Sequence, residues 1–476
     1  MNVNANYFLF LIYFISFSSF SFDFNVYKLD PLDHDPDVNM FYSKNIEPDL
    51  DCDEYTHQFL TSTLLSLESI ANISLCNSTQ LKITWSNVQK ESYGVGLSSA
   101  AFMPTITASI GSSQNTTKSN SDLSVTNLEG STNQLNFAWR LFDFGTRNSN
   151  LNASKSLLDS SLNIHSAALQ KNLLVTVNSY FDYLNSYLQY KNKYKNLSLV
   201  NDLHESNLRK FDYGLVSSND ILNSSSAIVK ANLILIKSEG ELAKAKTVLV
   251  NSMGIQMDPA LINIQHDIVF ENLFFDIKDL NFWLSQALLV NPSIKSAFSQ
   301  YQVSQHKLEA ARTEGLPTLD FNYNQYSNGY PSEGFSMPGR KVNSLSFTLN
   351  IPIFEGFSSL FKIKSAIAIN NQSQAQLDEI KLQTINDVVK SYSELLSYSK
   401  NYDAAKSFHD TALSLMENTR KRFDNGAADI SDLINSQSVF FDAKHEFDKS
   451  RIDLFSSKFK LLANVGFLEK KDFILK

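Results

Sequence analysis

The chain has 476 residues, of which 43% are hydrophobic and only 15 are glycine and 10 proline, so long uninterrupted elements are favoured over many short ones. Its formal net charge is −8 and it has no dense block of Lys and Arg, which excludes a surface built for nucleic acid. Because no nucleophile motif and no HExxH or similar spacing occurs, we expect no enzyme, no metal site and no cofactor.

The N-terminus is predicted to direct export. Residues 1–21 contain an aromatic and aliphatic run followed by the small residues Ser19 and Ser21, which is typical of a signal peptide. No Lys or Arg precedes the run, so a membrane anchor is the competing interpretation, although the run is short for a bilayer. No later apolar run reaches the ~18 residues of a transmembrane helix, so a second membrane contact would have to use strands.

Residues 22–56 are predicted to form an acidic extension. Alternating carboxylates from Asp33 to Asp37 suggest calcium, but Val38 stands where a calcium loop needs glycine, so we interpret the segment as solvated. The two cysteines, Cys52 and Cys76, fall early in the exported part. An oxidising compartment would permit a disulfide between them, and two separate buried thiols are the alternative.

One short phrase occurs twice, as RKFDYGLVSSNDILN from Arg209 and as KRFDNGAADISDLIN from Lys421. The same offset of 212 residues joins three pairs: Gly214 and Gly426, Gly254 and Gly466, and Phe142 and Phe354. A constant offset indicates an internal duplication. We therefore expect two units at about 57–265 and about 282–467, a linker at 266–281 and a tail at 468–476.

Each unit is predicted to run helix, strand, strand, long helix, turn, helix. Strict alternation over 133–141 and 343–351 predicts strands with one apolar and one polar face. Their partners are expected at about 105–111 and 318–326. Polar loops are expected between the members of each pair, at 112–132 and 327–341.

The long helices are predicted at about 146–209 and 358–422, and neither contains proline. In the first, two heptad seams lie side by side, one of which is a tyrosine series that begins Tyr180, Tyr183, Tyr187. Two adjacent seams indicate that the long helix packs against neighbouring helices on both of its sides. A leading helix is predicted at about 282–315 in the second unit, and a return helix at about 217–254 in the first. At ~1.5 Å per residue, their summed length matches the length of one long helix, so we expect such helices to stack end to end.

Amphipathic strands in an exported protein are typical of a barrel wall in an outer membrane. Four strands cannot close a barrel, because about eight is the practical minimum, so the chain must associate. Three copies would give twelve strands and a lumen lined by Asn136, Arg140, Thr348 and Asn350. The alternative is an exported coiled-coil structural or adhesive protein, which would share the heptads without needing such strands.

The duplicated plan resembles the TolC family of outer-membrane efflux and type I secretion channels over roughly residues 57–467. The resemblance is carried by Pro-Thr junctions at Pro104 and Pro317, the LFDFG and IFEGF junctions and a Gly-Leu-Val-x-x-x-Asp turn. It implies a mainly α fold in which a trimeric, twelve-stranded outer-membrane β-barrel continues into a periplasmic α-helical barrel.

The resemblance also implies partners. They are two further copies in a homotrimer, outer-membrane lipid, a periplasmic adaptor protein and an inner-membrane pump of the RND, ABC or MFS type. The location would be the outer membrane of a Gram-negative bacterium. The substrate stays open between drug, metal, peptide and protein, because the pump selects it.

The repeated phrase is predicted to turn each long helix back, with Gly214 and Gly426 in the left-handed conformation. Asp220 and Asp432 would then lie in the first turn of a return helix, where a carboxylate favours the helix dipole. Around the first turn, Gly214, Leu215, Val216 and Ser217 resemble the adaptor-docking surface of the family, although a plain turn explains them nearly as well.

For Asp432 the resemblance implies more, because the matching family position contributes to an aspartate ring at the narrow tip of the closed tube. Three such carboxylates would attract cations. The second family aspartate is replaced here by Asn435, and a tip-locking arginine and its tyrosine partner are replaced by Ala428 and Phe423. We therefore expect one acidic ring and a tip held shut by fewer polar links.

Overall fold

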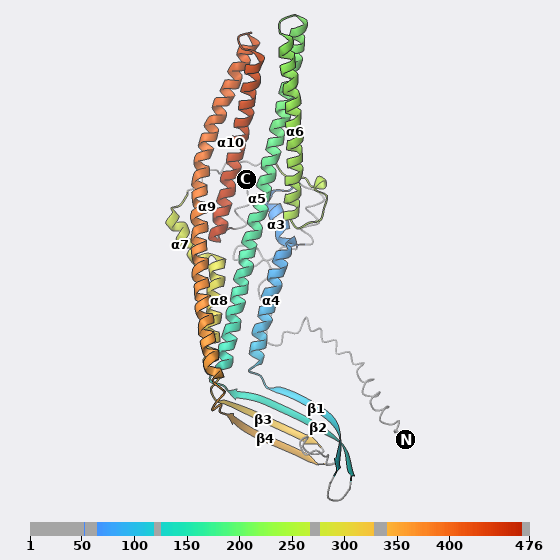
Figure 1. Ribbon diagram of the computed structural model, residues 1–476, viewed down its shortest axis with the longest axis vertical. Coiled ribbons are helices and arrows are strands. Elements are labelled where there is room, and N and C mark those ends of the chain that lie inside the picture. The colour runs from blue at the N-terminus through green and yellow to red at the C-terminus, as the bar shows by residue number, and fades with distance from the viewer. Residues whose placement is uncertain (1–51, 53–63, 119–124, 267–276, 328–339, 469–476) are drawn as a thin grey trace, which may run out of the picture. The chain divides into compact units, whose positions relative to one another are not determined.

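The computed structural model describes residues 52, 64–118, 125–266, 277–327 and 340–468. The predicted signal peptide and, apart from Cys52, the acidic extension lie outside these residues. The elements follow one order twice (Figure 1). The first copy contains α3 (Leu67–Asn77), α4 (Thr79–Ala100), β1 (Thr105–Lys118), β2 (Val125–Phe142), α5 (Thr146–Asp212) and α6 (Ser218–Ser252). The second contains α7 (Leu280–Val290), α8 (Pro292–Thr313), β3 (Thr318–Ser327), β4 (Lys341–Asn350), α9 (Ser358–Asp424) and α10 (Ile430–Val465), and the short 3₁₀ helix η3 (Pro259–Leu261) lies between the copies.

The helix lengths of the two copies agree closely. Each long helix, α5 and α9, has 67 residues, which is ~100 Å. In the first copy α3, α4 and α6 have 11, 22 and 35 residues, and in the second α7, α8 and α10 have 11, 22 and 36. In both copies the three shorter helices together therefore match the length of the long one. The predicted end-to-end stacking is confirmed.

The leading helix predicted at about 282–315 was wrong as a single element, because the chain breaks into α7 and α8 at Asn291 and Pro292. Proline lacks a backbone N–H and clashes with the preceding turn. The side chain of Asn291 then caps α8 by accepting hydrogen bonds from the backbone N–H groups of Ser293 and Ile294, at 2.8 and 3.3 Å. Ser78 caps α4 in the same way and separates it from α3.

Each returning helix ends against the break between two leading helices. In the first copy the Ser74 hydroxyl of α3 donates to the carbonyl of Ser252, the last residue of α6, at 2.9 Å. In the second copy the Asn291 amide donates to the carbonyl of Asn464 near the end of α10, at 2.8 Å. The same junction is thus built twice.

The four strands form one antiparallel sheet in the order β1-β2-β3-β4, so β2 of the first copy pairs with β3 of the second. The loop predicted at 112–132 was wrong for most of its length, because β1 and β2 stay paired until Lys118 faces Val125. Ladder hydrogen bonds need no apolar side chains, and this stretch contains several threonines, which favour strands. Of the loop predicted at 327–341, Ser327 ends β3, Lys341 begins β4, and residues 328–339 lie outside the description.

The first two tyrosines of the seam on α5, Tyr180 and Tyr183, are buried in the largest apolar cluster, where α5 meets α3 and the ends of α6 and α10. Tyr180 and Phe181 are almost fully buried there. The hydroxyl of Tyr183 is 2.7 Å from Nε2 of His266, and the ring of Tyr187 stacks on the same imidazole with 3.7 Å between centroids. The segment predicted as a linker from residue 266 therefore begins packed on α5.

The predicted tail at 468–476 also begins inside the core. Leu468 is 3% exposed, and the side-chain amide of Gln170 exchanges two hydrogen bonds with its backbone, at 3.0 and 3.1 Å. Residues 469–476 lie outside the description.

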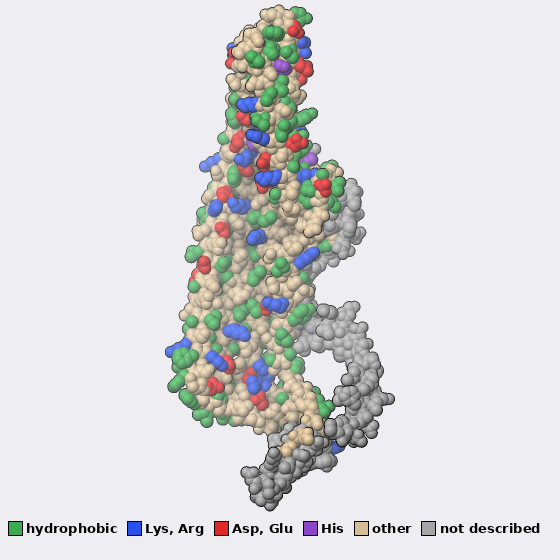
Figure 2. Space-filling view, turned by 45° about the vertical axis from the view of Figure 1, so that its right-hand side comes forward, with side chains coloured by type: hydrophobic (Ala, Val, Ile, Leu, Met, Phe, Trp, Pro, Cys, Tyr) green, Lys and Arg blue, Asp and Glu red, His purple; other side chains and the backbone are tan. Residues whose placement is uncertain are grey.

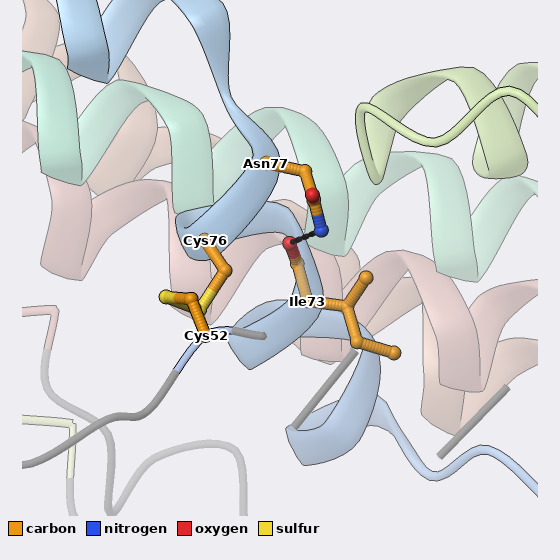
Figure 3. Close-up of a disulfide and its surroundings, with 4 residues drawn as sticks. All are labelled: Cys52, Ile73, Cys76 and Asn77. Atoms are coloured by element: carbon orange, nitrogen blue, oxygen red, sulfur yellow. Dashed lines mark hydrogen bonds between the residues drawn. A yellow bond between two sulfur atoms is a disulfide. The ribbon is translucent and has the colours of Figure 1, made fainter. Parts of the chain in front are cut away.

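Cys52 and Cys76 form a disulfide, with 5.4 Å between their Cα atoms (Figure 3). The alternative of two separate thiols was therefore wrong. Cys76 lies in the last turn of α3, beside Asn77, whose amide donates to the carbonyl of Ile73 at 2.9 Å. The bridge ties Cys52 to the last turn of α3.

The helices lie side by side around α5, which packs against α4, α6, α8 and α10, while α9 packs against α8 and α10. Across the described helices, α4 and α6 therefore border one side of the layer and α9 borders the other. Positive and negative side chains are interspersed along the helical part of the face in Figure 2. The sheet joins the helices at the end opposite the two hairpin turns (Figure 1).

Candidate functional site

The two hairpin turns have the same backbone. Gly214 has φ +67° and Gly426 has φ +73°, so the predicted left-handed conformation is confirmed at both. The N–H of Leu215 donates to the carbonyl of Lys210 at 2.9 Å, and that of Ala427 donates to the carbonyl of Arg422 at 2.7 Å. These bonds satisfy carbonyls that a helix end leaves open.

The aspartates that follow the turns have different environments. Ser217 and Asp220 form a capping box at the start of α6, in which the carboxylate accepts from the Ser217 hydroxyl at 2.7 Å and from its N–H at 2.8 Å. These two hydrogen bonds, the hydroxyl first, hold the pKa of Asp220 below its ordinary value. On α10 the cap is Asp429, which accepts from the N–H of Asp432 at 2.8 Å.

Asp432 and Asn435 are exposed one helical turn apart, so they share a face of α10. In the part of the chain that the structure describes, the Asp432 carboxylate has no ion pair. Asp432 therefore presents its charge outward, whereas Asp220 is used in a cap.

The two turns also differ in surface chemistry. Around the first, Tyr213 and Leu215 are 82% and 73% exposed, and Phe211 is exposed beside them. Val216 is half-buried, and Gly214 and Ser217 are exposed. The second turn, 424–428, carries Asp, Asn, Gly and two Ala in place of this apolar surface. The exposed aromatic residues Phe211 and Tyr213 were missed from the sequence, although they lie inside the repeated phrase.

Phe423 and Ala428, at which the resemblance led us to expect fewer polar links at the tip, lie in one apolar cluster. It joins Leu203 of α5 to Phe423, Ile430 and Leu433, with Ala428 packed against it. The ammonium of Lys210 lies 4.1 Å from the centroid of the Phe423 ring. The two hairpins are thus joined near their turns by apolar packing and a cation–π contact.

The sheet brings the four predicted lumen residues onto one face. Asn136 and Arg140 of β2 lie opposite Asn324 and Asp320 of β3. On the other neighbouring strand, β4, Thr348 lies opposite Asp320. Asn350 is the next residue of that face along β4. Asp320 was missed as a site residue, although the alternation of TLDFNYNQY places it on the polar face with Asn322 and Asn324.

The opposite face of the sheet is apolar and open. Phe321 contacts Phe137 on one side and Phe347 on the other, with centroids 5.8 and 5.1 Å apart. Ile106, Ile110, Leu345, Phe347 and Leu349 are all more than half exposed. An apolar surface of this kind marks a contact with lipid or with another protein.

Of the helices that the structure describes, none is both long and apolar enough to cross a bilayer. Across the same residues no group of three or more His, Cys, Asp or Glu side chains is arranged to hold a metal ion.

Comparison with known proteins identifies the family. The model of the family described as outer membrane efflux protein matches residues 70–255 and 283–455. The chain belongs to the outer membrane efflux protein family. The protein therefore acts in the outer membrane and extends into the periplasm, and its function is transport through a channel. The family is one of channel proteins rather than enzymes.

Individual relatives agree with this assignment. The chain is 26% identical over 404 residues to protein CyaE of Bordetella pertussis, which covers 84% of each chain. It is 26% identical over 190 residues, 40% of each chain, to the alkaline protease secretion protein AprF of Pseudomonas aeruginosa. The crystal structure of the CmeC outer membrane channel of Campylobacter jejuni shares the fold, with a TM-score of 0.74 over 85% of this chain and 86% of that one, at 18% identity.

Proposed function

We propose that three copies of this chain close into a ring and form an exit duct, in which a twelve-stranded outer-membrane barrel continues into a periplasmic helical tube. Each copy would contribute the two units at about 57–265 and 282–467. The observation that carries the proposal is a four-stranded sheet with an open apolar face, whose edge strands β1 and β4 each pair on one side only among the described residues. A strand edge that is both unpaired and apolar on one face needs a partner in lipid.

The helical layer supports a head-to-tail contact between copies. Its border helix α6 exposes a heptad-spaced apolar stripe of Leu222, Val229, Leu233 and Ile236. Its other border, α9, exposes Leu382, Phe408 and Leu415. Because α6 and α9 border opposite sides of the helical layer, the contact between neighbouring chains would join two different surfaces. Such a head-to-tail contact generates a ring when the rotation between neighbours closes.

The hairpin turns would form the periplasmic tip. The exposed first turn, with Gly214, Leu215, Val216, Ser217 and Asp220, is the proposed docking surface for a periplasmic adaptor, and Gly426 shapes the second turn. Asp432 would contribute to a single acidic ring at the pore, with Asn435 one turn behind it. In the barrel, Asn136, Arg140, Thr348 and Asn350 would face the lumen.

We further propose that the duct receives its substrate from an inner-membrane pump of the RND, ABC or MFS type. AprF is named as a protease secretion protein, and over the region that it shares with this chain it supports a protein as the exported substrate. The alternative is that the duct exports small molecules. Deletion of the gene followed by assays of secreted protein and of toxin sensitivity separates the two.

Conductance in a planar bilayer tests the duct directly. Detergent-extracted protein should insert into the bilayer and open discrete, long-lived ion-conducting channels. Purified protein that never conducts would contradict the proposal and would favour a structural or adhesive role.

Docking is tested separately with a photo-crosslinking residue at Ser217, which should capture the adaptor. The control has the same residue at Lys90, an exposed position on α4 far along the chain from either turn, and should capture none. Equal capture from both positions would contradict docking at the turn.

A further inference from the structure

A direct ion pair joins the two copies of the repeat across the polar face of the sheet. Nε of Arg140 donates to Oδ1 of Asp320 at 2.8 Å, and a second guanidinium nitrogen lies 3.4 Å from Oδ2. The side-chain amide of Asn350 donates to Oδ2 at 3.0 Å. One carboxylate of β3 is therefore held from β2 and from β4 together.

The pair carries all the charge of this face within the described strands. The register places Thr105, Thr107, Ser109, Gln134, Asn136, Asn322, Asn324, Ser344, Ser346 and Thr348 on the same face. None of these side chains is charged. The face therefore holds one cation and one anion in direct contact, with no net charge.

The pair lies where the strands join the helices. Arg140 is near the end of β2, and Asp320 is near the start of β3. Two further ion pairs lie at this junction, since Arg147 contacts Asp143 at 2.9 Å and Lys362 contacts Glu314 at 2.7 Å. Arg140 is half exposed, so without Asp320 its charge would act on the space in front of the sheet.

We propose that Asp320 is a selectivity-determining residue of the duct, which compensates Arg140 so that the barrel lumen does not discriminate between cations and anions. The inference rests on the proposed trimeric channel, in which three such pairs would form one neutral ring. Three arginines without their partners would instead attract anions and repel cations, and three aspartates alone would do the reverse. Charge selection would then be left to the acidic tip.

The test is the ion selectivity of single channels in a planar bilayer with a KCl gradient. Relative to wild type, Asp320→Asn should lower the potassium-to-chloride permeability ratio by about threefold or more, because three uncompensated charges face a pore. Arg140→Gln should raise it by a similar factor. The double variant R140Q/D320N should return to the wild-type ratio, because the face is neutral again.

Selectivity that is unchanged in both conducting single variants would overturn the inference, and so would a double variant that stays shifted. If a single variant does not form trimers, Asn350→Asp replaces it, since it adds one carboxylate beside Asp320. That variant should raise the ratio, and an unchanged ratio would overturn the inference. Wild-type protein that does not conduct would overturn the proposed function as well, whereas conducting variants without a shift overturn this inference alone.

Discussion

Gly254 lies so close to Asn77 that a Cβ atom on the glycine would be 2.8 Å from the backbone carbonyl oxygen of Asn77. Gly466 has the corresponding place in the second copy, where a Cβ would be 2.8 Å from Cδ of Pro292. Both glycines have positive φ, +71° and +93°. The repeat thus uses glycine twice where a returning helix meets the break between two leading helices.

Gly254→Ala should destabilise the protein by about 2 kcal/mol or more, because alanine is strained at positive φ and its Cβ would displace the α3 backbone. Thermal unfolding followed by circular dichroism measures the loss. The matched control is Gly240→Ala inside α6, where a Cβ meets no heavy atom within 4 Å. That change should stabilise by about 0.5–1 kcal/mol. Equal stability of the two variants would show that the junction does not need glycine.

The disulfide should contribute about 2–4 kcal/mol, since it closes a loop between residues that are 24 positions apart. Adding a reductant should therefore lower the unfolding temperature of the wild-type protein. The double variant Cys52→Ala/Cys76→Ala should start at the lower temperature and should not respond to the reductant. A wild-type protein that is equally stable with and without the reductant would contradict this role.

Tyr183 should make the fold sensitive to alkali. Burial first, and the neighbouring Tyr187 second, raise the pKa of its phenol from 10.0 to about 12. Because the folded state favours the protonated phenol, this stabilisation is complete below pH 10 and is lost as the pH rises from about 10 to about 12. Tyr183→Phe should flatten that part of the stability curve, and it should cost about 0.5–1.5 kcal/mol at neutral pH through the lost bond to His266.

Urea unfolding between pH 8 and pH 12 measures this effect. The control is Tyr213→Phe, the same chemical change at a side chain that is 82% exposed, and its curve should follow the wild type. A Tyr183→Phe curve with the wild-type slope above pH 10 would contradict the assignment.

Asp432→Ala should weaken block of the channel by multivalent cations by about tenfold, because three carboxylates leave the pore together. Asp220→Ala is the control, since that carboxylate is held in a cap with Ser217. It should leave the block in place while the start of α6 exchanges its amide hydrogens faster. Block by multivalent cations that is the same in Asp432→Ala and in wild-type channels would contradict the proposed acidic ring.

Much of the fold could be predicted because its signals are periodic and local. The heptads from Tyr180 indicated a helix with two flanks, and the alternation from Leu135 to Leu141 indicated a strand with two faces. Gly214 and Gly426 marked the turns because only glycine takes a left-handed helix stop without strain. Pro292 was a local signal too, and the break that it causes was missed because the apolar pattern continued across it.

Contacts between distant segments could not be predicted in the same way. Asp320 and Arg140 are 180 residues apart, and their pairing depends on the register between strands of the two repeat units of one chain. His266 covers Tyr187 because a connection folds back on α5, which no period in the sequence encodes. The cysteines allowed only one bridge, but its formation depended on how close the chain brings Cys52 to α3.

The number of chains in the detergent-solubilised particle tests most directly whether the chain forms a trimeric barrel. The four strands of one chain can close a barrel only by pairing with strands of other chains. Native mass spectrometry of the purified protein measures that number. A particle of three chains is expected. A population made only of single chains would contradict it.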